Sequence, residues 1–297
     1  MMQGVVCVGS LNVDTLMYVE KFCEDDEEQI IENMFVSSGG QAGNVAAGLG
    51  KLGKKSFFFG NIGKDAYTSM LIKDFEESNV DYSFAKRTGN PNNTVVSLVN
   101  KDGERRMYAC NHVKLSQADF PDKLFENTAF IIFTSLIKED VIELYVDIAK
   151  KAKEKGIKIA LDPGNILAQL GFEKLRPLLE LTDYFFPSKK EAELLGVSKI
   201  CELIPNVIIT CGKEGPKVFK KGEEITNFEV KQARKRIDTT GAGDCFAAAY
   251  ISAIIDGKDD AEAACFANCA AALSIEKKGA RSMPTQEETE VFMNANL

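Results

Sequence analysis

The sequence predicts an α/β protein of three layers, in which helices cover both faces of a mostly parallel sheet. From Asp65 onward, short apolar runs alternate with amphipathic segments, a pattern typical of parallel strands joined by right-handed helical crossovers. The 297 residues are 45% hydrophobic, so the chain can bury one large core. We therefore expect one α/β domain that carries a small additional β-sheet.

The individual elements follow from the length and spacing of the apolar runs. The segment 139–155, for example, places Val141, Leu144, Ile148 and Ala152 on one helical face. A hairpin of strands 217–220 and 223–230 is expected around Gly222. The other expected strands are 5–10, 56–59, 130–134, 157–161, 184–186 and 207–210, and the other expected helices are 44–53, 65–78, 172–181, 189–195, 242–256 and 259–277.

Two segments do not fit the α/β pattern and indicate the small sheet. The first contains the acidic run 24–28, which is too charged for a core segment. The second contains the strand-like runs 94–100 and 104–110, joined by the turn Lys101-Asp102-Gly103. We assign residues 13–37 and 92–113 to this sheet, and residues 1–12, 38–91 and 114–297 to the α/β domain.

Composition and charge exclude several classes of partner. A formal net charge of −8 argues against nucleic acid or an anionic membrane, because either requires a clustered basic face. No apolar run approaches the roughly 18 residues of a membrane span, and the first residues lack a basic signal-peptide start. The eight cysteines include no Cys-x-x-Cys pair, as in proteins of reducing compartments. We expect a cytoplasmic protein.

A glycine-rich segment at residues 48–53 imitates a nucleotide-binding motif. Residues 48–53 match Gly-x-Gly-x-x-Gly, and residues 48–55 nearly match a phosphate-binding P-loop. Both motifs require a strand, then the loop, then a helix, whereas here a helix ends at the glycines and strand 56–59 follows. We interpret Gly53 as a helix C-cap. The single histidine, His112, lies outside any protein-kinase motif and is expected to be a structural or surface residue.

The segment 236–250 combines a turn, an acidic residue and a helix start. Gly241 and Gly243 allow the backbone to approach a ligand, and the alanines that follow favour helix. The N–H groups of Gly241, Ala242 and Gly243 at this helix start would suit a phosphate or a developing negative charge. A carboxylate such as Asp244 would repel a phosphate bound there, so its presence suggests a chemical role. Accepting a proton from an attacking hydroxyl group is one such role. The alternative is that the segment only caps a helix.

Polar residues also follow the first strand. Asn12 and Asp14 lie just beyond the buried run that ends near Gly9. Ligands gather at the carboxyl ends of parallel strands, so these side chains could bind the hydroxyl groups of a polyol. An Asx turn is the structural alternative.

Four segments, in this order, resemble the motifs of the ribokinase-type (PfkB) carbohydrate kinases. They span nearly the whole chain, which makes the set far more specific than any one motif. They are residues 9–14 (GSLNVD), 39–46 (GGQAGNVA), 210–215 (TCGKEG) and 238–244 (DTTGAGD).

The resemblance implies an ATP-dependent kinase that phosphorylates a primary hydroxyl of a sugar. Asp244 would be the general base and the backbone of Gly241, Ala242 and Gly243 the anion hole. The small sheet would be a lid over the sugar and could join two copies of the chain. The sugar site implied by the motifs comprises Asn12, Asp14, Gly40, Gln41 and Asn44.

The resemblance also implies sites for the nucleotide and for metal ions. Glu191 would organise Mg²⁺ through water, although Ser188 stands where the family has asparagine. Asp238, with the loop 278–282, matches a potassium site. The nucleotide residues implied are Thr210, Gly212, Gly215 and Asn268.

Two departures from the family pattern concern the acceptor. Gln41 replaces a lysine of ribokinases, and the segment 133–136 lacks their sugar-binding glutamate, so we expect ribose not to be the best acceptor. A nucleoside is the alternative acceptor. A sugar- or nucleotide-binding sensor without catalysis is an alternative of another class, although a binding protein would have no use for a base. The helix dipole is expected to keep Asp244 ionised and a weak base.

Overall fold

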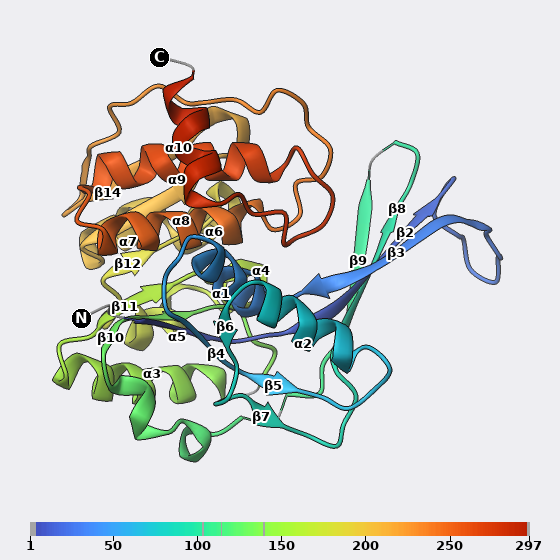
Figure 1. The fold of residues 1–297 in the computed structure, drawn as a ribbon, viewed down its shortest axis with the longest axis horizontal. Helices are drawn as coiled ribbons and strands as arrows, with labels where there is room; N and C mark the ends of the chain where they lie inside the picture. The colour runs from blue at the N-terminus through green and yellow to red at the C-terminus, as the bar shows by residue number, and fades with distance from the viewer. Residues whose placement is uncertain (1–3, 103, 114, 139, 296–297) are drawn as a thin grey trace.

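The computed structural model describes residues 4–102, 104–113, 115–138 and 140–295. Within this part of the chain, a nine-stranded sheet has the order β15-β14-β13-β12-β11-β10-β1-β4-β6, as Figure 1 shows in outline. All neighbours are parallel except β13–β14 and β14–β15. The strands are β1 (Gly4–Val8), β4 (Ser56–Phe59), β6 (Val80–Asp81), β10 (Thr128–Phe133), β11 (Lys158–Leu161), β12 (Tyr184–Phe185), β13 (Asn206–Thr210), β14 (Pro216–Lys220) and β15 (Glu223–Glu224).

Helices cover both faces of this sheet (Figure 1). On one face lie α1 (Gln41–Lys51), α2 (Thr68–Glu77), α8 (Ala242–Ile255) and α9 (Asp260–Ser274). On the other lie α3 (Val141–Glu154), α4 (Gly164–Ala168), α5 (Phe172–Leu179), α6 (Lys189–Leu195) and α7 (Val197–Leu203). Apart from the strands of a second, smaller sheet, the remaining described elements are α10 (Gln286–Asn294), the short strands β5 (Asn61–Ile62) and β7 (Lys86–Arg87), and the 3₁₀ turns η1 (Gln117–Asp119), η2 (Asp122–Phe125) and η3 (Gly212–Glu214).

Strand β1 explains why the sheet needs two helical layers. Val5 and Cys7 belong to the core on the α1 and α8 side, whereas Val6 and Val8 belong to the core on the α3 side. Alternate side chains of a strand point to opposite faces, and all four are fully buried. An apolar strand of this kind must be covered on both faces, and the three layers predicted from the sequence are confirmed.

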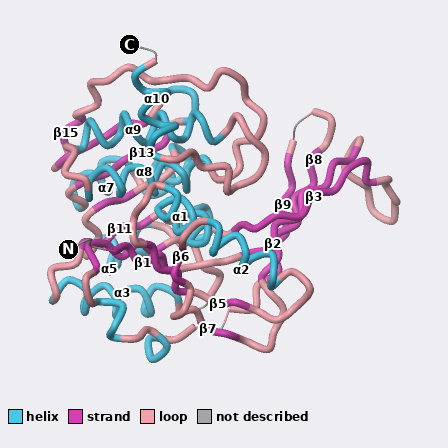
Figure 2. Tube along the Cα trace, viewed as in Figure 1, coloured by secondary structure: helices cyan, strands magenta, loops and turns pink. Residues whose placement is uncertain are grey.

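A second sheet of four strands projects from the domain, to the right in Figure 1 and as the magenta projection in Figure 2. Its order is β3-β2-β8-β9, with β2 (Asn12–Val19), β3 (Ile31–Gly39), β8 (Asn93–Val99) and β9 (Arg105–Cys110). It confirms the predicted small sheet. The exact residues at which the chain divides into two parts stay a prediction, and Gly103 of the predicted hairpin turn lies outside the described residues.

Several predicted boundaries were wrong. Helix α1 begins three residues earlier than expected, and α2 begins at Thr68 because Asp65 accepts a hydrogen bond from the N–H of Tyr67 in the preceding turn. The strand expected over 223–230 is only the short β15. Helix α10 was missed, although Thr285 and Glu288 form a capping box that is visible in the sequence.

The glycine-rich segment 48–53 lies where context predicted. It ends α1, with Gly53 in a left-handed conformation (φ 75°) just after the helix, and β4 follows. Across the described ranges, none of the helices has the length and apolar character that crossing a membrane would require.

Candidate active site

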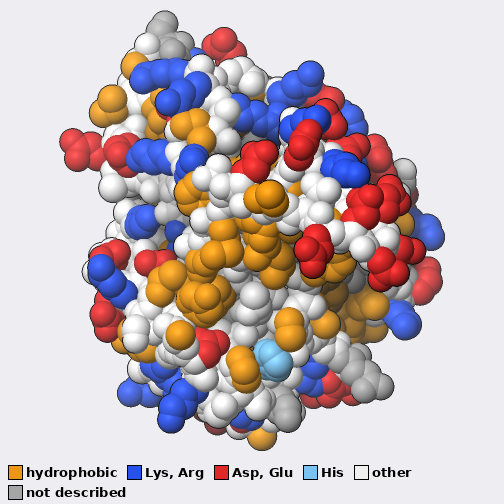
Figure 3. Space-filling view, turned by 90° about the vertical axis from the view of Figure 1, so that its right-hand side faces the viewer, with side chains coloured by type: hydrophobic (Ala, Val, Ile, Leu, Met, Phe, Trp, Pro, Cys, Tyr) orange, Lys and Arg blue, Asp and Glu red, His pale blue; other side chains and the backbone are white. Residues whose placement is uncertain are grey.

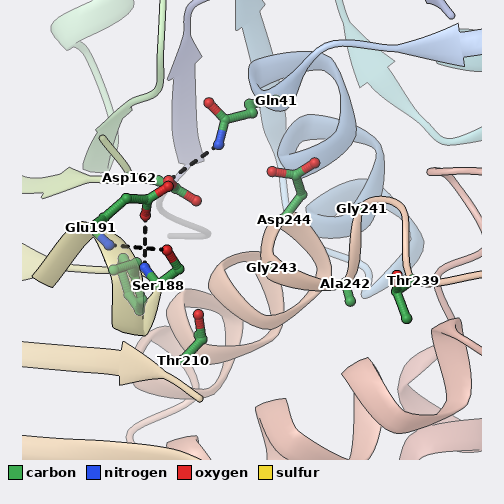
Figure 4. A pocket seen from close by; sticks show the side chains of 11 residues that line it. Gln41, Asp162, Ser188, Glu191, Thr210, Thr239, Gly241, Ala242, Gly243 and Asp244 are labelled. Carbon is green, nitrogen blue, oxygen red and sulfur yellow. Dashed lines mark hydrogen bonds between the residues drawn. The ribbon is translucent and has the colours of Figure 1, made fainter. Parts of the chain in front are cut away.

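The site lies at the carboxyl ends of the central strands, where the N-termini of α1 and α8 also meet. A cavity of about 260 Å³ opens there, and Figure 4 shows Asp162 and Glu191 on one side of it and Asp244 on the other. We call it the carboxylate cavity. Its lining residues are Gln41, Asp162, Phe186, Ser188, Glu191, Thr210, Thr239, Gly241, Ala242, Gly243 and Asp244.

The start of α8 brings backbone N–H groups to this cavity. Gly241 is the N-cap and has a left-handed conformation (φ 76°), and a Cβ there would overlap the carbonyl oxygen of Ala280. Around the Cβ position of Gly243, by contrast, the space is open among the described residues, so the helix backbone is accessible to a ligand. Because the first N–H groups of a helix lack intrahelical acceptors, this terminus can stabilise an anion.

Asp244 occupies the first turn of α8 and is buried. The side-chain amide of Asn44 donates a hydrogen bond of 2.7 Å to its Oδ2. Burial raises the pKa of Asp244 to about 7, the charge of Asp14 adds to the effect, and the hydrogen bond from Asn44 opposes it. The expectation that the helix dipole keeps Asp244 a weak base was therefore wrong, because desolvation outweighs it.

Asp162 is a site residue that the sequence interpretation passed over. It follows β11, and its Oδ1 accepts hydrogen bonds from Gln41 Nε2 (3.2 Å) and from the N–H of Gly164 (3.0 Å). Burial raises the pKa of Asp162 well above its usual value, and the charges of Asp244 and Glu191 raise it further. The signal was available, because an aspartate directly after a buried strand is the same pattern that singled out Asp14.

Gln41 lies in the carboxylate cavity, beside the ends of β10 and β11. Its Oε1 accepts a hydrogen bond from the N–H of Ser135 at 3.1 Å and another from the Ser135 hydroxyl. Because Gln41 Nε2 donates a hydrogen bond to Asp162, both the oxygen and the nitrogen of the amide have a hydrogen-bond partner within the protein.

The other predicted sugar residues lie at the root of the small sheet. Gly40 is the N-cap of α1 (φ 87°), and a Cβ there would lie 2.8 Å from the N of Asn12. Asp14 Oδ1 is buried and has no hydrogen-bond partner within the described part of the chain. Burial raises the pKa of Asp14 to about 6, against the charge of Arg281. Of the predicted set, Gln41 faces the carboxylate cavity, and Asn44 connects the sheet root to Asp244.

The oxygen donors of the carboxylate cavity suit a hard divalent cation. Glu191 Oε2 accepts a 2.7 Å hydrogen bond from the N–H of Ser188, in the capping box that begins α6. Among the described residues, no three His, Cys, Asp or Glu side chains lie close enough together to hold a metal directly. Mg²⁺ commonly keeps several waters and binds through one or two carboxylates and substrate phosphates, so Asp162 and Glu191 fit such an ion.

A second cavity, of about 450 Å³, adjoins the first and shares Thr210, Thr239, Ala242 and Gly243 with it. Lys213 and Arg236 give it positive charge. The four residues predicted to bind the nucleotide all line this second cavity: Thr210, Gly212, Gly215 and Asn268. Asn268 Oδ1 accepts a 2.7 Å hydrogen bond from the N–H of Lys231, so its oxygen is held by the backbone.

Asp238 joins the turn before α8 to the loop 278–282. Its Oδ1 accepts hydrogen bonds from the N–H and hydroxyl of Thr240, and its Oδ2 accepts one of 3.0 Å from the N–H of Gly279. Although burial would raise the pKa of Asp238, these hydrogen bonds hold it below its usual value. The carboxylate is therefore ionised at neutral pH.

Two adjoining cavities, a helix N-terminus that can stabilise an anion and a buried carboxylate suit a phosphotransferase with an alcohol acceptor. The sequence matches the pfkB family carbohydrate kinases over residues 2–287, and the chain belongs to that family. It is 29% identical to a ribokinase of Haemophilus influenzae, over 99% of each chain. Arabidopsis thaliana ribokinase, complexed with ribose and ATP, superposes with a TM-score of 0.87 at 25% identity and covers 99% of both chains. A nucleoside kinase of Methanocaldococcus jannaschii superposes with a TM-score of 0.88 at 25% identity and the same coverage.

Proposed function

We propose that this protein transfers the γ-phosphoryl group of ATP to a primary hydroxyl of a sugar. The observation that carries the proposal is the position of Asp244, which lies beside Gly243 and Ala242 where the two cavities meet. An acceptor hydroxyl in the carboxylate cavity would then lie between a proton acceptor and the phosphates of a nucleotide in the second cavity.

The reaction follows from this arrangement. The hydroxyl oxygen attacks the γ-phosphorus, its proton passes to Asp244, and the bond from phosphorus to the ADP oxygen breaks. The N–H groups of Gly241 to Gly243 stabilise the charge on the transferring group. Mg²⁺, held through water by Asp162 and Glu191, would neutralise phosphate charge. Asp238, which is ionised and ties two loops together, is the proposed ligand of a monovalent cation such as K⁺.

The two faces of the small sheet suit two tasks. Paired residues of neighbouring strands share a face, so the register places Phe35 and Met107 on the face of Asp14. Lys278 lies over the ring of Phe35, 4.6 Å from its centroid, so this face turns toward the loop 278–282, which packs against Gly241 at the start of α8. We assign Asn12, Asp14 and Gly40 to the acceptor hydroxyls and this face to a lid that excludes water.

The opposite face of the small sheet carries Met34 and Tyr108, both more than half exposed. Figure 3, which looks onto the small-sheet side of the molecule, shows hydrophobic side chains gathered across the middle of that side. We propose that a second copy of the chain covers this face. Sedimentation of Tyr108→Asp should then give a monomer where the parent protein gives a dimer, and equal sedimentation would refute the pairing.

A nucleoside is the second candidate acceptor, because the nucleoside kinase of Methanocaldococcus jannaschii superposes as closely as the ribokinase does. ADP formation from ATP and Mg²⁺ tests both candidates, with D-ribose, D-fructose, adenosine, inosine and cytidine as separate acceptors. Acceptor-dependent ADP formation supports a kinase, and the acceptor that produces it identifies the class. Binding of ATP without ADP formation from any acceptor would favour the catalytically silent sensor.

A further inference from the structure

Arg281 lies in the loop between α9 and α10, and its side chain crosses to α1 and α2. The loop is fixed there because Lys51 Nζ donates a 2.7 Å hydrogen bond to the carbonyl oxygen of Arg281. The guanidinium lies over the ring of Phe75, 4.8 Å from its centroid, and Nη1 is 3.7 Å from Asp74 Oδ2. Its side chain is only 9% exposed, so a cation is buried between two helices.

This burial is costly for the fold. Nη1 and Nη2 of Arg281 have no hydrogen-bond partner among the described residues. A buried charge whose N–H groups lack acceptors destabilises a protein, and an apolar side chain of similar volume is often the more stable choice. The ion pair with Asp74 and the contact with the Phe75 ring offset part of this cost, but neither contact involves Nε, which faces Asn44.

The remaining nitrogen of the guanidinium reaches the base through Asn44. Gly43 of α1 leaves space for the guanidinium, because a Cβ at that position would lie 2.8 Å from Nη2 of Arg281. Arg281 Nε donates a hydrogen bond to Asn44 Oδ1 at 3.5 Å, and Asn44 Nδ2 donates one to Asp244 Oδ2 at 2.7 Å. An amide whose oxygen faces a donor must present its NH₂ on the other side, so the Nε donor of Arg281 favours the orientation of Asn44 that presents its NH₂ to Asp244.

We propose that Arg281 is a positioning residue that acts through Asn44 to orient the carboxylate of Asp244 for proton transfer. With Oδ2 held by Asn44, the other oxygen, Oδ1, is directed to the acceptor hydroxyl. The inference rests on the proposed function, because it requires Asp244 to be the base.

The charge of Arg281 contributes in the same direction. It lowers the pKa of Asp244, as it does for Asp14, against the effect of burial. The other charged groups near this chain of contacts are Asp74 and Lys51 beside Arg281, and Asp162 across the cavity.

The experiment compares Arg281→Met in the parent protein and in Asp244→Asn. Turnover is measured with MgATP and whichever of D-ribose, D-fructose and adenosine the parent phosphorylates fastest. In the parent, we expect Arg281→Met to lower kcat about tenfold while the KM for ATP changes less than about twofold. In Asp244→Asn, the same substitution should change kcat less than about twofold, since no base remains to be oriented.

Two further variants separate orientation from packing. Arg281→Lys keeps the charge but removes the Nε donor, and we expect it to recover part of the lost kcat and to fold if Arg281→Met does not. Asp74→Asn removes the carboxylate beside Nη1 without removing the Nε donor to Asn44, and we expect its kcat to stay within about twofold of the parent.

Equal losses from Arg281→Met with and without Asp244 would overturn the inference, as would a loss in Asp74→Asn as large as that in Arg281→Met. Either result leaves the proposed function intact. If the single variant Asp244→Asn kept the kcat of the parent, that result would instead contradict the proposed function, in which Asp244 is the base.

Discussion

The side-chain amide of Asn44 donates a 2.7 Å hydrogen bond to the carboxylate of Asp244, a residue 200 positions further along the chain. Asn44 is in the first turn of α1 and Asp244 in the first turn of α8. The contact therefore joins two helix N-termini and lies between the root of the small sheet and the carboxylate cavity. Asp244 is both buried and hydrogen-bonded, and its reactivity depends on which of these effects dominates.

The pH dependence of the reaction should report the ionisation of Asp244. Burial raises its pKa to about 7, and only the ionised form can accept a proton. As pH falls below 7, kcat/KM should therefore decrease about tenfold per pH unit, and it should level off above 7. The profile is measured from about pH 5.5 to 8.5 at saturating Mg²⁺. A flat profile over this range would show that no group with this pKa controls the reaction.

The two glycines at the start of α8 should respond differently to alanine. At Gly241, φ is 76° and a Cβ would overlap Ala280, so Gly241→Ala should destabilise the protein by about 1 to 3 kcal/mol. At Gly243, a Cβ enters open space within the described structure, so stability should be kept or raised by up to about 1 kcal/mol.

Gly243→Ala should nevertheless impair turnover, because its methyl group would occupy the space intended for the phosphoryl group. Urea unfolding and kcat of the two variants provide the measurement. Equal stability of both variants, or parental kcat in Gly243→Ala, would argue against this part of the site.

Ribose should not be the best acceptor. Gln41 is uncharged, and its hydrogen bonds with Ser135 and Asp162 fix the orientation of its amide, so the side chain offers a sugar hydroxyl no charged donor. Comparison of kcat/KM over sugars and nucleosides checks this, and the highest value for ribose would contradict it.

Potassium should activate the enzyme by ordering the loop before α8. Asp238 holds that loop to Gly279 and lies three residues before Gly241. Replacing K⁺ by tetramethylammonium at constant ionic strength should therefore lower kcat. An unchanged kcat would leave Asp238 with only its structural hydrogen bonds to Thr240 and Gly279.

Local sequence patterns predicted most strands of the central sheet and the start of α8, although they missed the two-residue strand β6. Buried strands read as apolar runs, and Gly241 to Asp244 are contiguous in the chain. The contacts of Arg281 could not be predicted in this way, because Arg281 and Asn44 lie 237 positions apart and meet only through the packing of α1, α2 and the loop after α9. The pKa of Asp244 is a second example, since the helix start is visible in the sequence but the burial that outweighs its dipole is not.

The role of Asp244 as the base is the central claim, and Asp244→Asn tests it most directly. The substitution keeps the size of the side chain and its place in the first turn of α8, and both proteins should melt alike. Removing a negative charge beside the phosphates should leave the Kd for ATP unchanged or slightly lower.

Loss of a general base lowers kcat by about 10² to 10⁴-fold, equivalent to about 3 to 5 kcal/mol in the activation barrier. The measurement is kcat and the ATP Kd of Asp244→Asn beside the parent, and the account predicts that kcat falls into this range while ATP binding is retained. A variant that keeps more than about a tenth of the parental kcat would contradict it, because that loss corresponds to only about 1.4 kcal/mol.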